Sequence, residues 1–178
     1  MKKITAFFLT IAFTALASSC VNTSYEDEYM KASKILVGDK IPEFTLTSSD
    51  NRQLVSADLA GKRSLIYFFI TTCGDCKKVT PVMQGVWEKV SNDDNYRLII
   101  VNRGESMDTV DEYFSSNGVT MPYYLDQLKE TYNKFAEKYV PRVYIVDENG
   151  IDYKIIQQIK EVKRERISTY VNYVPGAR

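Results

Sequence analysis

The feature that most constrains this chain is a pair of cysteines placed between an apolar run and a helical pattern. Cys73 and Cys76 follow the apolar residues 65–70 and open a segment in which apolar residues recur every three or four positions up to Val90. This order predicts a buried strand, a turn and a helix. A thiol in the first helical turn lies near free backbone N–H groups and the positive end of the helix dipole, which favour a thiolate. The pattern therefore indicates redox-active cysteines.

The N-terminus has the pattern of a bacterial secretion signal. Two lysines precede the apolar residues 4–16, a stretch shorter than the about 20 residues that a membrane-spanning helix needs. Small residues then lead to Cys20 in an arrangement similar to the lipid-attachment signal of bacterial lipoproteins. We therefore expect a signal peptide over residues 1–19 and a lipid-modified Cys20 at the start of the mature protein. The alternative is an ordinary secretory signal with an incidental cysteine.

The remainder divides into a polar tether over residues 20–34 and one domain over residues 35–178. Strands are expected at residues 65–70, 98–101, 143–146 and 153–156. One helix is expected to begin at Cys73, and three further helices are expected over residues 107–117, 128–139 and 161–173. The dipeptide Asn149-Gly150 predicts a hairpin between the last two strands. Strands that alternate with helices and end in a hairpin predict an α/β fold, with helices on both faces of a mixed central sheet.

Composition excludes several classes of function. The chain contains no histidine, which excludes catalysis by Ser-His-Asp or Cys-His groups and metal sites built from imidazole. Its 23 basic residues balance its 23 acidic residues, so no electrostatic field favours nucleic acid. A tetrahedral zinc site needs more nitrogen and sulfur ligands than the three cysteines supply. We therefore expect neither a nucleic-acid partner nor a bound metal.

Several segments together resemble the thioredoxin-like envelope thiol–disulfide oxidoreductases of the TlpA/ResA type, in the redoxin superfamily. The likeness includes the segment 37–46, the connector 58–62, Pro81 in the first long helix, and Val140-Pro141 with the hairpin after it. It implies a thioredoxin-like fold that exchanges dithiols and disulfides with other proteins.

The resemblance also implies roles for the residues around the cysteines. Cys73 would attack a substrate disulfide and Cys76 would resolve the mixed disulfide, so the Cys73–Cys76 disulfide itself replaces any cofactor. Gly74 and Asp75 would shape the active-site turn. Three further residues would bind the substrate: Thr72, Val140 and Pro141. The peptide bond between Val140 and Pro141 would be cis.

The expected partners are disulfide- or dithiol-containing proteins of the cell envelope and a membrane redox partner. The lipid on Cys20 would anchor the protein to a membrane, facing the periplasm. Because Val21, rather than aspartate, follows Cys20, we expect the outer membrane, with exposure at the cell surface as a further option.

The chain departs from the family pattern at four positions. Thr72 replaces the usual tryptophan, Tyr67 replaces the buried aspartate of thioredoxin, Val79 replaces a glutamate and Arg142 replaces a threonine. The acidic groups that relay protons in relatives are therefore missing from these positions.

Three other interpretations of the cysteine pair remain open at this level. A purely structural disulfide would contribute only about 2 kcal/mol across so short a loop, compared with about 3 kcal/mol for a loop of about 15 residues. A thiol peroxidase would normally carry a proline–threonine–cysteine pattern, which is missing here. The third is a thioredoxin-fold binding module with a non-catalytic disulfide.

Overall fold

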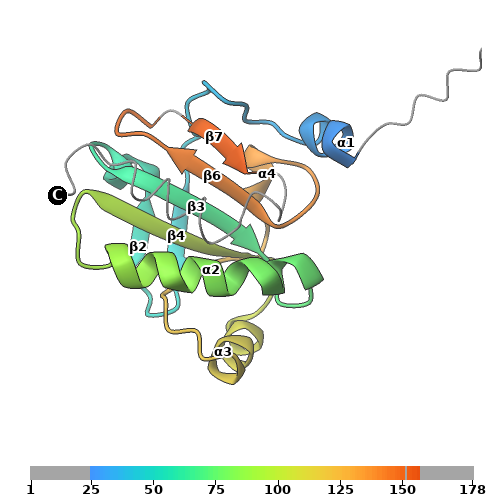
Figure 1. Cartoon of the computed structure of the whole chain (residues 1–178), viewed down its shortest axis with the longest axis vertical. Coiled ribbons are helices and arrows are strands. Elements are labelled where there is room, and N and C mark those ends of the chain that lie inside the picture. Colours follow the sequence, from blue (N-terminus) through green and yellow to red (C-terminus); the bar gives the residue numbers. More distant parts are fainter. Residues whose placement is uncertain (1–24, 151, 157–178) are drawn as a thin grey trace, which may run out of the picture.

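A mixed β-sheet organises the part of the chain that the structure, a computed structural model, describes: residues 25–150 and 152–156. In these residues seven strands form one sheet in the order β2-β1-β5-β4-β3-β6-β7 (Figure 1). The elements in chain order are α1 (Tyr25–Lys31), β1 (Thr45–Ser48), β2 (Gln53–Val55), the 3-10 helix η1 (Ser56–Leu59), β3 (Arg63–Phe69), α2 (Gly74–Val90), β4 (Tyr96–Arg103), α3 (Met107–Ser116), β5 (Tyr124–Asp126), α4 (Tyr132–Phe135), β6 (Arg142–Val146) and β7 (Asp152–Ile156). Because β3 pairs parallel with β4 and antiparallel with β6, the predicted mixed sheet is confirmed.

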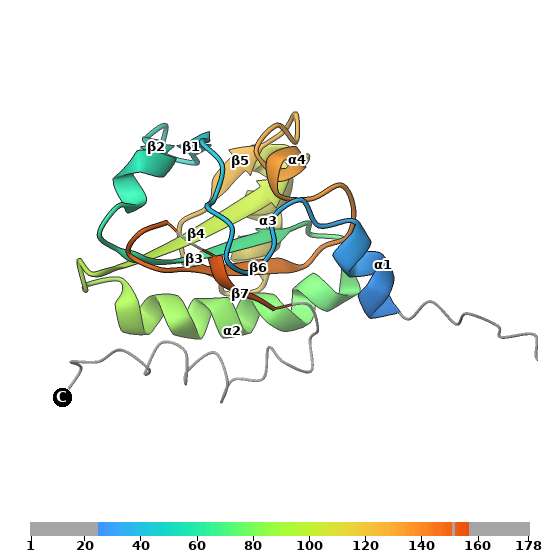
Figure 2. The same cartoon turned by 90° about the horizontal axis from the view of Figure 1, so that it is seen from above.

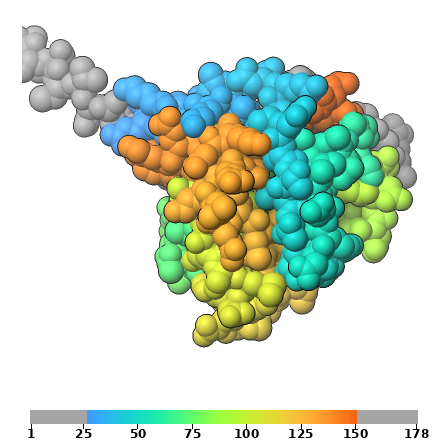
Figure 3. Space-filling view, turned by 180° about the vertical axis from the view of Figure 1, so that it is seen from behind, coloured from blue at the N-terminus to red at the C-terminus, as the bar shows by residue number. Residues whose placement is uncertain are grey.

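Helices cover both faces of the sheet, as the sequence predicted. α2 and α3 contribute to one hydrophobic cluster, whereas α1, η1 and α4 contribute to a second cluster on the other face. Figure 2 shows α2 on the side of the sheet opposite η1 and α4. In Figure 3 the cyan segment that leads through β1 lies against the orange segment that contains α4, and Lys134 Nζ donates a hydrogen bond to the Glu43 carbonyl oxygen between them.

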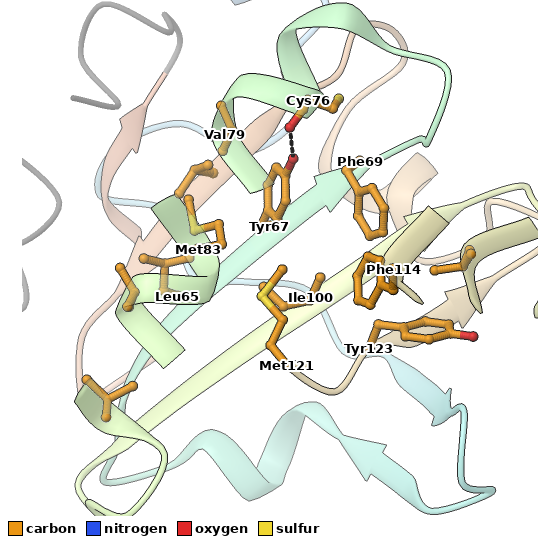
Figure 4. Packing of buried hydrophobic residues seen from close by; sticks show 14 of the residues in the cluster. Leu65, Tyr67, Phe69, Cys76, Val79, Met83, Ile100, Phe114, Met121 and Tyr123 are labelled. Carbon is orange, nitrogen blue, oxygen red and sulfur yellow. Dashed lines mark hydrogen bonds between the residues drawn. The ribbon is translucent and has the colours of Figure 1, made fainter. Parts of the chain in front are cut away.

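The central strand β3 is buried on both faces. Leu65, Tyr67 and Phe69 pack under α2, whereas the alternate residues Ile66 and Phe68 belong to the opposite cluster. Figure 4 shows the first set beneath α2. Alternation with a period of two residues is the geometry of a strand, and burial on both faces explains why its sequence is almost wholly apolar.

α2 also forms where the sequence predicted it. Cys76, Val79, Met83, Val86 and Val90 are buried, at spacings of three or four residues that place them on one helical face. The same helix continues through Pro81, although proline cannot donate a backbone hydrogen bond to the preceding turn.

The predicted helix over residues 128–139 is wrong, because α4 spans only Tyr132–Phe135. Before it, Lys129 has a φ of 60°, which lies outside right-handed helix geometry. The Asp126 carboxylate accepts hydrogen bonds from the N–H groups of Thr131 and Tyr132, over 3.1 and 2.7 Å, and holds this turn. The apolar spacing here comes from burial of a loop rather than from a long helix.

The predicted tether over residues 20–34 is also wrong for its second half. Residues 25–31 form α1, and Tyr29 and Ala32 are 0% and 6% exposed. Ser33 makes an isolated β-bridge to Ala136. The folded unit therefore begins before residue 35, because the aromatic ring of Tyr29 is part of the second cluster.

Several predicted terminal features lie outside the described residues. These are the signal peptide 1–19, Cys20 and the helix over 161–173. Among the helices that the structure does describe, none has the length and apolar character needed to cross a bilayer.

Phe68 provides a direct test of the core. Its side chain is 0% exposed and contacts the rings of Tyr132, Phe135 and Tyr144, at centroid distances of 5.2–6.1 Å. Phe68→Ala should lower the free energy of unfolding by about 3–5 kcal/mol, because it removes buried area and leaves a cavity. Urea denaturation measures this change. The control Leu128→Ala, at a residue that is 78% exposed, should change stability by less than about 0.5 kcal/mol.

Candidate active site

The two cysteines lie at the N-terminus of α2 with different exposure. Cys73 is the N-cap residue and is partly exposed, whereas Cys76 is 1% exposed in the first turn. Both are free thiols in this structure. The backbone N–H of Cys76 donates a hydrogen bond to Cys73 Sγ over 3.1 Å. The accessible sulfur therefore lies at the N-terminus of α2 and accepts a hydrogen bond from its first turn.

The loop before β6 brings Val140 and Pro141 to the same place. The peptide bond between them is cis, and both side chains are partly buried. The Val140 carbonyl oxygen accepts a hydrogen bond from the Cys73 thiol over 3.5 Å. The structure therefore joins one predicted catalytic residue to two predicted substrate-binding residues, although they are far apart in the sequence.

The other predicted site residues surround Cys73 on the surface. Thr72, Gly74 and Asp75 are all exposed. The Asp75 carboxylate forms an ion pair with Lys78 Nζ at 3.0 Å, and both side chains are more than half exposed. A Cβ added at Gly74 would meet no atom within 4 Å, so packing within the chain does not require glycine there.

Cys76 is buried, and among the described residues it lies beside the hydroxyls of Tyr67 and Thr80. Burial raises the pKa of the Cys76 thiol well above its ordinary value, and a hydrogen bond with Cys73 adds to the shift. The Tyr67 hydroxyl donates to the Cys76 carbonyl oxygen over 3.2 Å (Figure 4). It also lies 3.2 Å from Thr80 Oγ1. Burial also raises the pKa of Tyr67, so this hydroxyl keeps its proton. At position 67, where thioredoxin has a buried aspartate, this chain therefore has a neutral phenol.

One acidic residue of the site was missed by sequence reasoning. Glu105 accepts hydrogen bonds from the backbone N–H and the hydroxyl of Thr71, both over 2.8 Å. It also accepts one from the side-chain amide of Asn102, which is 0% exposed. These bonds hold the loop that leads into Cys73. The position of Asn102 and Glu105 at the end of the second apolar strand is the sequence signal that could have indicated them. That strand pairs in parallel with β3, with Phe69 opposite Asn102, and functional side chains gather at the carboxyl ends of neighbouring parallel strands.

Two other kinds of site, a ligand pocket and a metal site, have less support among the described residues. A pocket of about 670 Å³ lies between the segment 40–60 and the hairpin end of the sheet, lined by Ile41, Phe44 and Leu59 among others, and it includes neither cysteine. Over the described ranges, no three histidine, cysteine or acidic side chains group as metal ligands would. The cysteine pair therefore remains the site with the clearest chemistry.

Comparison with known proteins agrees with this geometry. The family model described as "AhpC/TSA family" matches residues 37–154. Thiol-disulfide oxidoreductase ResA of Bacillus cereus is 24% identical over 175 residues, which cover 98% of this chain and 99% of that protein.

Two solved structures are similar in fold. One is of a protein proposed to be a disulfide isomerase from Bacteroides thetaiotaomicron, with a TM-score of 0.72, 26% identity, and coverage of 80% of this chain and 90% of that one. The other is the thioredoxin domain of a thiol-disulfide oxidoreductase from Bacteroides vulgatus, with a TM-score of 0.66, 17% identity, and coverage of 79% and 99%. The thioredoxin-like fold predicted from the sequence is thereby confirmed.

The burial of Cys76 predicts a pH dependence of stability in the reduced protein. In the unfolded chain a cysteine ionises near pH 8.5, whereas the folded Cys76 keeps its proton to higher pH. The protonated Cys76 thiol therefore makes its full contribution to the free energy of unfolding below about pH 8.5. Above about pH 8.5 the free energy of unfolding falls by at most about 1.4 kcal/mol per pH unit. Urea denaturation of the reduced protein and of Cys76→Ser, at pH 7 and pH 9.5, measures the difference. An equal difference at both pH values would contradict the buried thiol.

Proposed function

Because the chain belongs to the AhpC/TSA family and places an accessible Cys73 beside a buried Cys76, we propose that it is a thioredoxin-like thiol–disulfide oxidoreductase of the ResA/TlpA type. The observation that carries this proposal is the contact between Cys73 and the Val140–Pro141 loop. A reactive sulfur and a backbone segment able to pair with a substrate strand lie together there.

The first step is attack by the Cys73 thiolate on a disulfide of the substrate. A bond forms between Cys73 Sγ and one substrate sulfur, while the substrate disulfide breaks and its second sulfur leaves as a thiolate. Cys73 is suited to this role because it is the more exposed thiol and caps α2. Thr72 and Val140 flank the mixed disulfide that results.

The second step is attack by Cys76 on Cys73 Sγ. The Cys73–Cys76 disulfide forms, the bond between Cys73 and the substrate breaks, and this substrate sulfur also leaves as a thiolate. The proton given up by Cys76 and one from solvent complete the substrate dithiol, and two electrons have passed from the cysteine pair to the substrate. Cys76 must lose its proton for this attack, and its burial opposes that loss. Hydrogen bonding from the Tyr67 hydroxyl lowers the pKa of the Cys76 thiol, but by less than burial raises it. A second redox protein then reduces the pair again.

The N-terminal sequence supports a location in the cell envelope. We propose that residues 1–19 direct secretion and that lipid on Cys20 anchors the domain to a membrane, facing the periplasm. Disulfide-bearing envelope proteins are then the substrates, and a membrane redox protein is the electron donor. Disulfide exchange suits such an oxidising compartment.

Substitution of the cysteines tests the proposed reaction. Cys73→Ser should abolish reduction of insulin disulfides in the presence of dithiothreitol, because it removes the attacking sulfur. Cys76→Ser should leave Cys73 able to attack but unable to release the substrate, so mixed disulfides should accumulate. Turbidity of insulin and non-reducing electrophoresis measure these outcomes.

A matched control and a contradicting result complete this test. Ser91→Ala, at the opposite end of α2, should reduce insulin at the rate of the unaltered protein. An unreactive Cys73 in the reduced protein, with cellular function retained in Cys73→Ser, would instead indicate a binding module. Rapid reduction of hydroperoxides with slow reaction of insulin would indicate a peroxidase.

The lipid anchor has its own test. Cys20→Ala should abolish incorporation of labelled palmitate and move the protein from the membrane fraction to the soluble periplasmic fraction. Lipidation is the physical cause, because acyl chains bury CH₂ groups in the bilayer at about 0.8 kcal/mol each. Control cells carrying Ser19→Ala should keep both properties. Unchanged membrane attachment in Cys20→Ala would disprove the anchor while leaving the exchange reaction untouched.

A further inference from the structure

α1 makes contacts beside the active site that the sequence did not predict. It lies outside the residues 37–154 that the family model matches. Figure 2 shows it at the end of the sheet where α2 begins and where the chain returns from α4 to β6. Two side chains, Tyr29 of α1 and Arg142 of β6, join the helix to the returning loop.

Arg142 holds α1 and the loop from inside the protein. Its side chain is 0% exposed. Nε and Nη2 donate to the Lys138 carbonyl oxygen over 3.0 and 2.8 Å, and Nη2 also reaches the Tyr29 carbonyl oxygen over 3.2 Å. Nη1 donates to Ser33 Oγ over 2.7 Å. Among the side chains described from Asp27 to Gly150, no carboxylate forms an ion pair with Arg142. Carbonyl and hydroxyl oxygens and the Tyr29 ring, 3.9 Å from its guanidinium carbon, lie against this charge.

Tyr29 contacts the loop on both sides of Val140. Its hydroxyl donates to the Pro141 carbonyl oxygen over 3.2 Å, and its ring stacks on that of Tyr139 with centroids 6.3 Å apart. Tyr139 has a φ of 70°, a conformation that is uncommon for residues other than glycine and persists where neighbours hold it. The Tyr139 hydroxyl donates to the Glu28 carboxylate over 3.0 Å. α1 thus supports the backbone that faces Cys73.

We propose that α1 and Arg142 form a clamp that fixes the Val140–Pro141 segment for docking of an extended substrate polypeptide. Tyr29 and Arg142 are positioning residues in this clamp, since they hold the docking segment without reaching Cys73. The proposal rests on the proposed oxidoreductase function, because the segment matters only if Cys73 reacts with a docked substrate.

The clamp defines the class of substrate that depends on it. An extended polypeptide that pairs with the Val140 backbone binds more tightly when that backbone is already ordered, because binding does not then have to order it. A small aromatic disulfide needs only access to Cys73 Sγ. Loosening the clamp should therefore weaken reaction with peptide disulfides far more than reaction with small ones.

The experiment compares the reduced forms of Tyr29→Phe and Arg142→Lys with the unaltered protein. Tyr29→Phe removes only the hydroxyl that donates to Pro141, and Arg142→Lys keeps the charge but loses the planar set of donors. The probes are a disulfide-linked dimer of an extended peptide and 5,5′-dithiobis(2-nitrobenzoic acid). We expect KM for the peptide to rise about tenfold, equivalent to about 1.4 kcal/mol, with kcat and the rate with the small probe within about twofold.

Two matched controls separate the clamp from a general loss of structure. Tyr123→Phe removes a partly buried hydroxyl that donates to Asp111 at α3, and Arg63→Lys alters an ion pair with Glu148 at the other end of β3. Neither should change KM for the peptide. Hydrogen exchange over residues 138–142 should accelerate in Tyr29→Phe and remain unchanged in both controls.

Each outcome supports or overturns the clamp. A rise in KM for the peptide in Tyr29→Phe, absent from Tyr123→Phe, supports it, and the Tyr29 variant decides the matter alone if Arg142→Lys does not fold. Equal KM values in Tyr29→Phe and the unaltered protein would overturn it. Failure of the unaltered protein to react with either probe would instead disprove the proposed oxidoreductase function.

Discussion

The antiparallel register between β3 and β6 is the constraint on which the site depends. Phe68 lies opposite Arg142, so Pro141 comes next to the end of β3 from which the Cys73 loop departs. A slip of one residue would turn every side chain of β3 to the wrong face, and both faces of that strand are buried. The parallel pairing of β3 with β4 brings Glu105 to the same loop. The position of the reactive sulfur is thus set by the core rather than by the loop alone.

The sequence predicted those parts of the fold whose signals are local. β3, α2 and the terminal hairpin carry their own periodicity, and Cys73, Cys76 and Pro141 could be located from spacing and family resemblance. The failures arose where distant contacts decide the structure. At residues 128–139, apolar residues that are buried in a loop happen to have helical spacing. At residues 20–34 the polar composition gave no sign of α1, which packs on the domain through Tyr29. Two of the partners of Arg142, Tyr29 in α1 and Ser33 just after it, lie more than 100 residues away, so no local pattern could reveal these contacts.

Uncharged groups lie beside Cys76, the thiol that we propose resolves the mixed disulfide. Tyr67 and Thr80 provide hydroxyls beside Cys76, and burial keeps both Tyr67 and Cys76 protonated. Of the acids at the described site, Asp75 pairs with Lys78, and Glu105 accepts hydrogen bonds from Thr71. The hydrogen bonds of Glu105 hold the loop that leads into Cys73, whereas the hydroxyls of Tyr67 and Thr80 lie beside Cys76. In the proposed reaction, the burial of Cys76 opposes the loss of the proton that must precede its attack.

The closeness of α1 to Cys20 has a consequence for how substrates are found. α1 begins at Tyr25, and the five residue-to-residue steps from Cys20 to Tyr25 span at most about 18 Å even when fully extended. With the acyl anchor proposed above, the start of α1, and with it the proposed clamp, remains close to the lipid headgroups. Encounters then become a lateral search over the bilayer surface, which favours clients that are themselves emerging from, or tethered to, the same membrane.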